Sequence, residues 1–339
     1  MNPDLSRRRA TLRRRTTLVA TAAVLALGLA ACSSGGGKAS TTADAGSGGK
    51  VASTPRLTIA VVTHESPGDS FWDKIRAGAE AAAAKDNVDL KYSQDPDGGK
   101  QAGLVQNAVD SKVDGIAVTL SHPEPLKPAV QAAVSAGIPV VAFNSGIDQW
   151  KDVGALMYFG SDETVAGTAA GKRIADGGGK HPLCVIQEQG SVALEARCAG
   201  VKKSAPGTEN INVNGTDLAS VTSTIAAKLQ ADPSIDYVVT LGAPIALATL
   251  DAAKQADSKA KVVTFDLNAD VAKAIAAGTM EFSIDQQPYL QGYEAVDSLW
   301  LYVTNRNDIG GGLPVLTGPS FVDKDNIAAI AKYAAKNTR

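Results

Sequence analysis

The sequence predicts an α/β protein made of parallel sheets and divided into two domains. From Arg56 onward, short runs of β-branched and other apolar residues alternate with longer alanine-rich stretches, a pattern typical of repeated β-α-β units. The short runs are apolar at consecutive positions, as expected for strands that helices cover on both faces. About 285 residues follow the low-complexity region that ends near Thr54, which is more than one hydrophobic core usually organises.

The predicted elements follow one another in this alternating order. In chain order, the apolar runs predict strands at residues 57–63, 88–92, 115–120, 139–144, 183–187, 237–241, 262–266 and 282–285. The stretches between them predict helices at residues 71–85, 101–111, 127–136, 163–176, 225–231, 246–256 and 269–277, with a further helix beginning near Val192.

The N-terminus carries the features of an export signal. Six arginines precede an apolar run from about Leu18 to Leu29, which is shorter than the ~20 residues that a membrane-spanning helix needs. The following Leu29-Ala30-Ala31-Cys32 resembles the lipobox of bacterial lipoproteins, which implies a signal peptide at 1–31 and a lipidated Cys32. An ordinary cysteine after a secretory signal is the alternative, and the Sec and twin-arginine export routes both stay open.

Residues 32–54 are mainly Ser, Gly, Ala, Thr and Lys, a composition expected of a flexible linker between anchor and domain. Without the signal segment, 27 basic and 34 acidic side chains remain, so the mature chain has a net charge near −7. The absence of Lys/Arg clusters argues against nucleic acid as a partner. Cys184 and Cys198 remain as an even pair in an oxidising compartment, which predicts a disulfide between a strand and the helix after it.

Polar side chains follow several strands, among them His64 and the pairs Asn144-Ser145 and Gln187-Glu188. Ligands of open parallel sheets bind outside the carboxyl ends of the strands, so these turns should line the site. None of the three histidines belongs to a nucleophile or metal motif, and the sequence predicts neither metal nor cofactor. The P-loop-like segment 167–172 is one residue short and lies within a predicted helix, where its glycines favour close packing.

Aspartate and asparagine at strand ends, an arginine and a nearby aromatic face suit a polyhydroxyl ligand. With these features, the chain from Leu57 onward resembles the ribose-binding family, sugar-binding proteins of ABC importers with the type I periplasmic binding fold. The resemblance depends on the order and spacing of segments 69–72, 139–144, 160–163, 166–167, 195–200, 264–266 and 284–289.

This resemblance implies a ligand site shared by two lobes. Asp69, Phe71 and Trp72 match residues that contact and stack on the sugar, with one ring expected to pack and the other to meet the ligand. Arg197 and Asp266 match the second-lobe residues that bind sugar hydroxyls, and we expect them to hydrogen-bond to each other as well.

Four further positions depart from the ribose binders, and a fifth matches them. Asn144 stands in place of an aspartate, Ser145 of an arginine, Leu218 of an aromatic residue and Gly242 of an asparagine. Gln286 matches a glutamine at the hinge. Ribose itself is therefore doubtful, and a hexose, a cyclitol such as inositol or a furanose-like signal is left open.

The resemblance also implies two Rossmann-like lobes joined by a three-segment hinge, with crossings near residues 160–161, just after 286, and near 318–321. The expected lobes comprise 55–160 plus 287–318 and 161–286 plus 319–339. Closure of the lobes on a monosaccharide or polyol, and its delivery to an ABC permease, is the expected function.

The expected protein is a monomer anchored outside the cell membrane, and not an enzyme. The alternative is a sensor component that presents its ligand to a membrane receptor or kinase. A transcription factor on the same fold would need a DNA-binding headpiece where the signal and linker lie. An enzyme would turn over the bound sugar.

Overall fold

Residues 51–339, which the computed structural model describes, form two six-stranded sheets. Sheet A has the strand order β11-β5-β4-β3-β1-β2 and sheet B the order β12-β10-β9-β8-β6-β7. Every pairing is parallel except that of β12 with β10. The predicted α/β class with two Rossmann-like sheets is confirmed, with one antiparallel edge strand added.

The strands are β1 Leu57–Thr63, β2 Val88–Gln94, β3 Gly115–Thr119, β4 Val140–Asn144, β5 Met157–Ser161, β6 Pro182–Ile186, β7 Glu209–Asn212, β8 Tyr237–Thr240, β9 Lys261–Phe265, β10 Phe282–Asp285, β11 Val315–Gly318 and β12 Ser320–Asp323. The helices are α1 Phe71–Asp86, α2 Gly98–Asp110, α3 Pro123–Ser135, α4 Glu163–Asp176, α5 Val192–Ser204, α6 Leu218–Ala231, α7 Ala243–Gln255, α8 Ala269–Ala277, α9 Pro288–Asn305 and α10 Ile327–Ala334.

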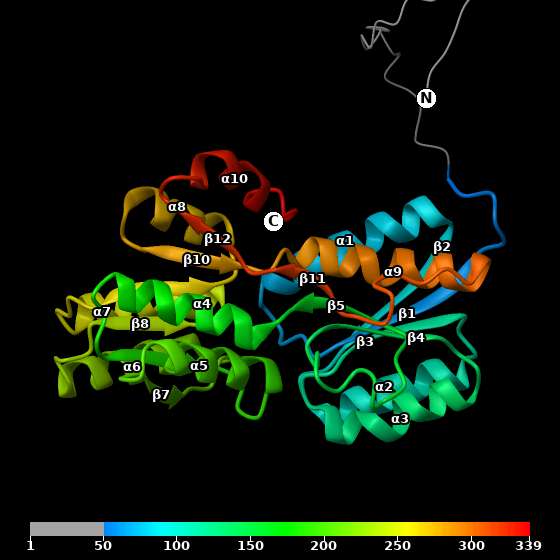
Figure 1. The fold of residues 1–339 in the computed structure, drawn as a ribbon, viewed down its shortest axis with the longest axis horizontal. Helices are drawn as coiled ribbons and strands as arrows, with labels where there is room; N and C mark the ends of the chain where they lie inside the picture. The colour runs from blue at the N-terminus through cyan, green and yellow to red at the C-terminus, as the bar shows by residue number, and fades with distance from the viewer. Residues whose placement is uncertain (1–50) are drawn as a thin grey trace, which may run out of the picture. The chain divides into compact units, whose positions relative to one another are not determined.

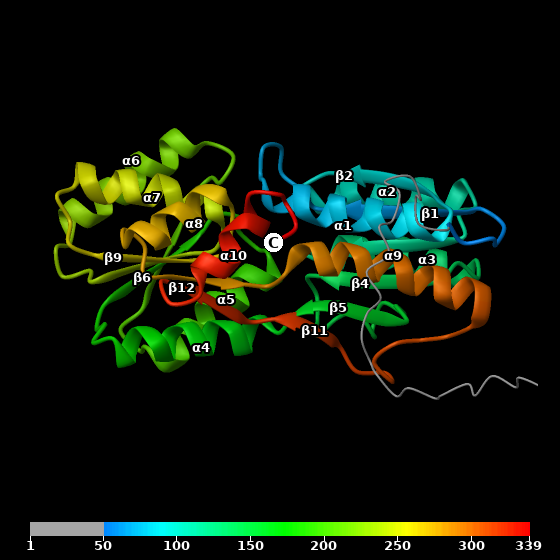
Figure 2. The same ribbon diagram turned by 90° about the horizontal axis from the view of Figure 1, so that it is seen from above.

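Helices cover both faces of each sheet. On sheet A, α1 and α9 lie on one face and α2 and α3 on the other (Figure 1). On sheet B, α4 and α5 lie opposite α6 and α7 (Figure 2). The central strands β3, β4 and β6 are buried along their whole length, which explains why their sequences are apolar at consecutive positions.

The chain passes from one sheet to the other three times. It leaves sheet A after β5, returns from sheet B between β10 and α9, and passes directly from β11 into β12 (Figure 1). Each sheet is therefore built from segments that are distant in the sequence.

The structure also contains elements that the sequence did not predict. Strands β5, β7, β11 and β12 have only four or five residues, and the edge strand β7 is largely exposed, so it lacks an apolar run. Helix α6 begins at Leu218, seven residues before its predicted start. Its first turns are rich in Ser and Thr, so the sequence pattern did not indicate a helix there. Helices α9 and α10 complete the fold.

Glycines allow one pair of helices in each lobe to touch through their backbones. A Cβ added to Gly292 of α9 would lie 2.0 Å from the carbonyl oxygen of Ile75 in α1. A Cβ on Gly167 of α4 would lie 2.1 Å from the carbonyl oxygen of Arg197 in α5. The P-loop-like segment is thus a helix-packing surface, as the sequence analysis favoured.

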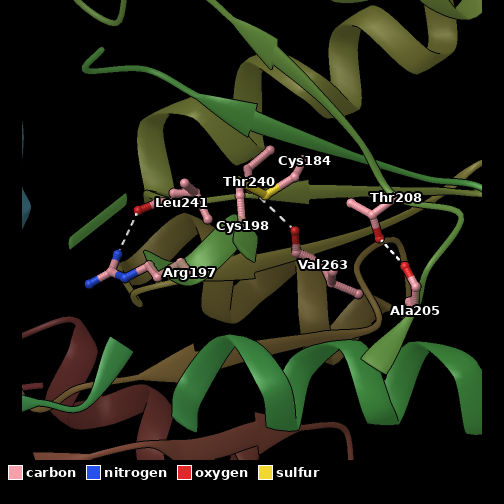
Figure 3. Close-up of a disulfide and its surroundings, with 8 residues drawn as sticks. All are labelled: Cys184, Arg197, Cys198, Ala205, Thr208, Thr240, Leu241 and Val263. Atoms are coloured by element: carbon pink, nitrogen blue, oxygen red, sulfur yellow. Dashed lines mark hydrogen bonds between the residues drawn. A yellow bond between two sulfur atoms is a disulfide. The ribbon is translucent and has the colours of Figure 1, made fainter. Parts of the chain in front are cut away.

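The structure contains the predicted disulfide between Cys184 of β6 and Cys198 of α5 (Figure 3). Both cysteines are fully buried in the core between sheet B and helices α4 and α5. Cys198 follows Arg197 directly in α5. The disulfide therefore attaches the turn of α5 that contains Arg197 to strand β6.

The predicted signal peptide at 1–31 and the lipid attachment at Cys32 lie outside the described residues. The end of the predicted linker already contacts the folded part, since the amide nitrogen of Ala52 donates to Lys85 O and the indole nitrogen of Trp300 to Thr54 Oγ1. Within residues 51–339, no helix combines the length and hydropathy that crossing a membrane would require.

We expect Gly292→Ala to destabilise the protein by about 1–3 kcal/mol, because its methyl group forces α9 away from α1. Gly103→Ala is the matched control, since Gly103 is an exposed residue of α2 with open space around it. The control should be neutral or stabilising by up to about 1 kcal/mol. Urea denaturation measures both, and equal effects would contradict the backbone contact between the two helices.

Candidate functional site

A cavity of about 630 Å³ lies among loops at the carboxyl ends of strands from both sheets. Sheet A and its helices contribute residues 64, 66–69, 72 and 96, while sheet B and its helices contribute 187–189, 212–216, 218, 242 and 244–245. The volume falls within the range of ~300–1,000 Å³ that is usual for small-molecule sites. The cavity therefore lies at the strand ends, where the sequence predicts a ligand site.

On the side of sheet A, the cavity wall consists of an aromatic cluster beside a carboxylate. The Trp72 ring lines the cavity and packs edge-on against Phe71, 5.2 Å away, and His64, 4.7 Å away. Phe71 itself does not line the cavity. Asp69 Oδ1 accepts a hydrogen bond from the amide nitrogen of Phe71 at the start of α1, and burial raises the pKa of Asp69.

Arg197 is buried, does not line the cavity and forms its hydrogen bonds within its own lobe. Its Nε is 2.6 Å from Glu163 Oε2 and its Nη2 is 3.0 Å from Glu163 Oε1, which makes a bidentate pair. Nη1 donates to the carbonyl oxygen of Leu241 at 3.1 Å (Figure 3). Both charged side chains are buried, and the charge of Glu163 raises the pKa of Arg197 although burial opposes it.

The prediction of a hydrogen bond between Arg197 and Asp266 is wrong, because the guanidinium group binds Glu163 instead. The close glycine contact between α4 and α5 places Glu163, in the first turn of α4, beside Arg197. Three of the five guanidinium N–H groups are used in these bonds, and Arg197 does not line the cavity.

Asn144, Gln286 and Asp266 form a buried chain of hydrogen bonds between the two sheets. Asn144 Nδ2 donates to Gln286 Oε1 at 3.3 Å, and Gln286 Nε2 donates to Asp266 Oδ1 at 2.7 Å. Gln291 of α9 joins the chain by accepting from Asn144 and donating to Gln286 and to Thr317 Oγ1. The structure thus brings together three predicted site residues, although none of them lines the cavity.

Asn144 and Asp266 occupy matching positions, directly at or after the end of a strand in each sheet. Both have left-handed backbone conformations, with φ of 65° and 66°, which Asn and Asp tolerate better than other non-glycine residues. Burial raises the pKa of Asp266 to about 7, although the nearby charge of Arg197 opposes this shift. Lys74 is also buried, near Asp266 and Asp69, and burial lowers its pKa.

The remaining predicted residues are divided between the cavity and the core. Leu218 is 44% exposed and lines the cavity with Gly242, at the start of α6 and just before α7. Ser145 is fully buried outside the cavity wall, and its Oγ has no hydrogen-bond partner among residues 51–339.

Three polar residues of the cavity wall, His64, Gln187 and Glu188, come from strand-end turns that the sequence predicts to line the site, although they were not among the assigned ligand-binding residues. His64 lies against Thr119 Oγ1, 2.7 Å from its Nδ1, and burial lowers its pKa. Gln187 and Glu188 follow β6, and Glu188 contacts Ser121 and His122 of the opposite lobe. The polar pair after β6 was the available signal for these contacts.

One group of potential metal ligands, His181, Glu209 and Asp232, lies near the amino end of β6, away from the cavity. Lys228 Nζ lies 2.8 Å from Glu209 Oε2 and 3.7 Å from Asp232 Oδ2. The lysine therefore already supplies a cation to this group, which gives no indication of a metal site.

Comparison with known proteins identifies the fold. The family model for the periplasmic binding protein domain matches residues 59–307 of this chain. A carbohydrate transporter from Acidothermus cellulolyticus 11B, solved in complex with myo-inositol, is 62% identical, with a TM-score of 0.83 over 84% of this chain and 100% of that one.

Two more distant proteins show the same likeness. An ABC transporter solute-binding protein from Agrobacterium vitis with bound D-fucose is 26% identical, with a TM-score of 0.73 over 83% of this chain and 99% of that one. The xylose/arabinose-binding protein of Sulfolobus acidocaldarius is 25% identical over 82% of this chain and 74% of its own length.

We expect Arg197→Met to lower the free energy of unfolding by about 3–5 kcal/mol, because it leaves the Glu163 carboxylate buried without a partner. Adding Glu163→Leu should restore most of this loss. Lys172→Met in the exposed Lys172–Asp176 pair of α4 is the control and should cost less than about 1 kcal/mol. If urea denaturation finds the same loss of stability for Arg197→Met and Lys172→Met, the buried Arg197–Glu163 pair is no more important for stability than an exposed pair.

We expect the raised pKa of Asp266 to make the protein less stable as the pH rises from about 4 to about 7. In this range the folded protein keeps a proton that the unfolded chain, with an aspartate pKa near ~3.9, releases. The free energy of unfolding should fall by up to about 1.4 kcal/mol per pH unit and level off above pH ~7. Asp266→Asn should remove this part of the pH dependence. If the free energies of unfolding of the wild type and the variant differ by the same amount at every pH, the raised pKa of Asp266 is refuted.

Proposed function

The chain belongs to the periplasmic binding protein family, and on that premise we propose that it captures a neutral cyclitol or monosaccharide for an ABC importer. The observation that carries the proposal is the cavity between strand-end loops of both sheets, which offers an aromatic ring and carboxylates to one small molecule. A ligand that fills it contacts both lobes at once.

The cavity favours a ligand with many hydroxyl groups. Asp69 and Glu188 line the wall and Asp266 lies behind it, and carboxylates accept hydrogen bonds from hydroxyls. The same charges repel phosphates and carboxylates. The Trp72 ring supplies an apolar face for the C–H side of a ring.

Within this class we propose a cyclitol of the myo-inositol type as the ligand. The support is the Acidothermus protein, which is 62% identical and was solved with myo-inositol. Gly242, where ribose binders have a larger polar residue, lines the cavity and leaves space for a six-membered ring with a full set of hydroxyls.

Capture would occur by closure of two lobes, for which we propose the boundaries 55–160 plus 287–318 and 161–286 plus 319–339. A ligand bound by Asp69 and Trp72 on one lobe and by residues of the other stabilises the closed state, because only that state offers both sets of contacts. The occupied, closed form would then be the form that the permease recognises. On this account Phe71, Asn144, Arg197, Leu218 and Gln286 complete or support the site.

We further propose that the mature protein begins at a lipidated Cys32 after removal of residues 1–31, and that it acts as a monomer outside the cell membrane. A linker of about twenty residues would keep the protein within reach of a permease in the same membrane, so that local concentration replaces diffusion. The protein binds and releases its ligand unchanged and is not an enzyme.

We expect calorimetry to show binding of myo-inositol, and Asp69→Asn to weaken it by about tenfold or more. The variant removes a charged acceptor from the cavity but keeps an oxygen for the start of α1. Asp73→Asn, which changes an exposed residue of the same turn, should bind like the wild type. A wild-type protein that binds no cyclitol, hexose or pentose in a thermal-shift screen would overturn the proposed function.

A further inference from the structure

Beside the cavity, a cluster of polar side chains connects the loop after β3 of sheet A with the loop after β6 of sheet B. Ser121 Oγ lies 2.9 Å from Glu188 Oε1 and 2.8 Å from Ser191 Oγ, and His122 Nε2 lies 3.1 Å from the same Glu188 oxygen. The backbone nitrogen of Val192 donates to Ser121 O at 3.1 Å. These contacts join residues about seventy positions apart in the sequence and belong to opposite lobes.

The two carboxylate oxygens of Glu188 have different environments. Oε1 takes both contacts from the opposite lobe, whereas no group within residues 51–339 donates a hydrogen bond to Oε2. Glu188 lines the cavity, and its Oε2 is not among the buried polar atoms without a partner, so this oxygen is accessible. One carboxylate therefore has one oxygen committed to the opposite lobe and one available to a ligand.

We propose that Glu188 couples ligand binding to lobe closure, with Oε1 held by Ser121 and His122 and Oε2 accepting a hydrogen bond from a ligand hydroxyl. This inference rests on the proposed function. Glu188 would contact the ligand, whereas Ser121 and His122 are positioning residues that act through it.

The charges around this cluster favour the assignment. Its hydrogen bond with Glu188 raises the pKa of His122, against the effect of burial, and Asp97 contributes in the same direction. Burial would raise the pKa of Glu188, but the charge of His64 and the bonds from His122 and Ser121 outweigh it and lower the pKa. Asp69 also faces Glu188, and their mutual repulsion favours a hydroxyl donor between them.

The coupling makes closure dependent on pH. A charged His122 binds the carboxylate more strongly than a neutral one. The stabilisation of the closed form by the His122–Glu188 contact is therefore full at a pH below the pKa of His122 in the open form. It is lost as the pH rises through the higher pKa that His122 has when it contacts Glu188. Asp266 also titrates near the cavity, so the effect of His122 has to be isolated by substitution.

Calorimetric titration of the purified protein with myo-inositol tests the ligand contact. Glu188→Gln should raise Kd by about ten- to hundredfold, the range expected for a hydrogen bond to a charged group. Glu195→Gln, which changes an exposed glutamate of α5, is the matched control and should leave Kd unchanged. Equal Kd values for Glu188→Gln and the control would overturn the contact with the ligand.

The pH profile tests the positioning residue. Between pH ~6 and ~8, the Kd of the wild type should rise about two- to fivefold relative to that of His122→Gln, the range measured for partly exposed ion pairs. His122→Gln keeps a hydrogen-bond donor but does not titrate, and its folding is checked by its melting temperature. Parallel profiles for the two proteins would overturn the role of His122.

Small-angle X-ray scattering without ligand separates this inference from the proposed function. The wild type should be more compact at pH ~6 than at pH ~8, whereas His122→Gln should show little change. If no cyclitol binds but this difference is present, the ligand proposal alone has failed. If myo-inositol binds and neither the scattering nor the Kd profile depends on His122, the coupling proposal alone has failed.

Discussion

A buried network of side-chain amides holds the two lobes in register at the hinge. Asn144 from the end of β4, Gln286 from the segment after β10, and Gln291 from α9 bond to one another, and Thr317 of β11 and Asp266 after β9 complete the network. These groups lie where water cannot replace a lost partner, so each bond constrains the others. The chain passes between the sheets beside this network, which joins residues of both sheets.

The buried charges beside the cavity affect the stability of the protein and the kind of ligand that the cavity favours. The buried guanidinium of Arg197 is paired with Glu163 and forms no hydrogen bond with Asp266. Burial raises the pKa of both Asp69 and Asp266, and Glu188 accepts its hydrogen bond from a residue of the opposite lobe. A neutral ligand with several hydroxyl groups satisfies these acceptors without adding charge, whereas an anionic ligand would add to the repulsion.

Most of the architecture could be predicted from the sequence, because β3 and β4 are short runs that are buried along their whole length. Helices α4 and α8 each begin at a side-chain cap and end at a glycine. It could not give the edge strands β7, β11 and β12, whose residues are partly exposed and carry no apolar pattern. Of the residues predicted for the site, Asp69, Trp72, Leu218 and Gly242 line the candidate cavity. The pairing of Arg197 with Glu163, and of Glu188 with Ser121, depends on how helices and lobes pack, which spacing in the sequence does not encode.

The central claim is that one small polyol lies between the two lobes and contacts both. A crystal structure of the protein with myo-inositol tests it most directly. We expect the ring against Trp72, hydroxyls bound to Asp69 on one lobe and to Glu188 on the other, and Arg197 still paired with Glu163. A ligand that contacts residues of one lobe only, or that binds outside the cavity, would contradict it.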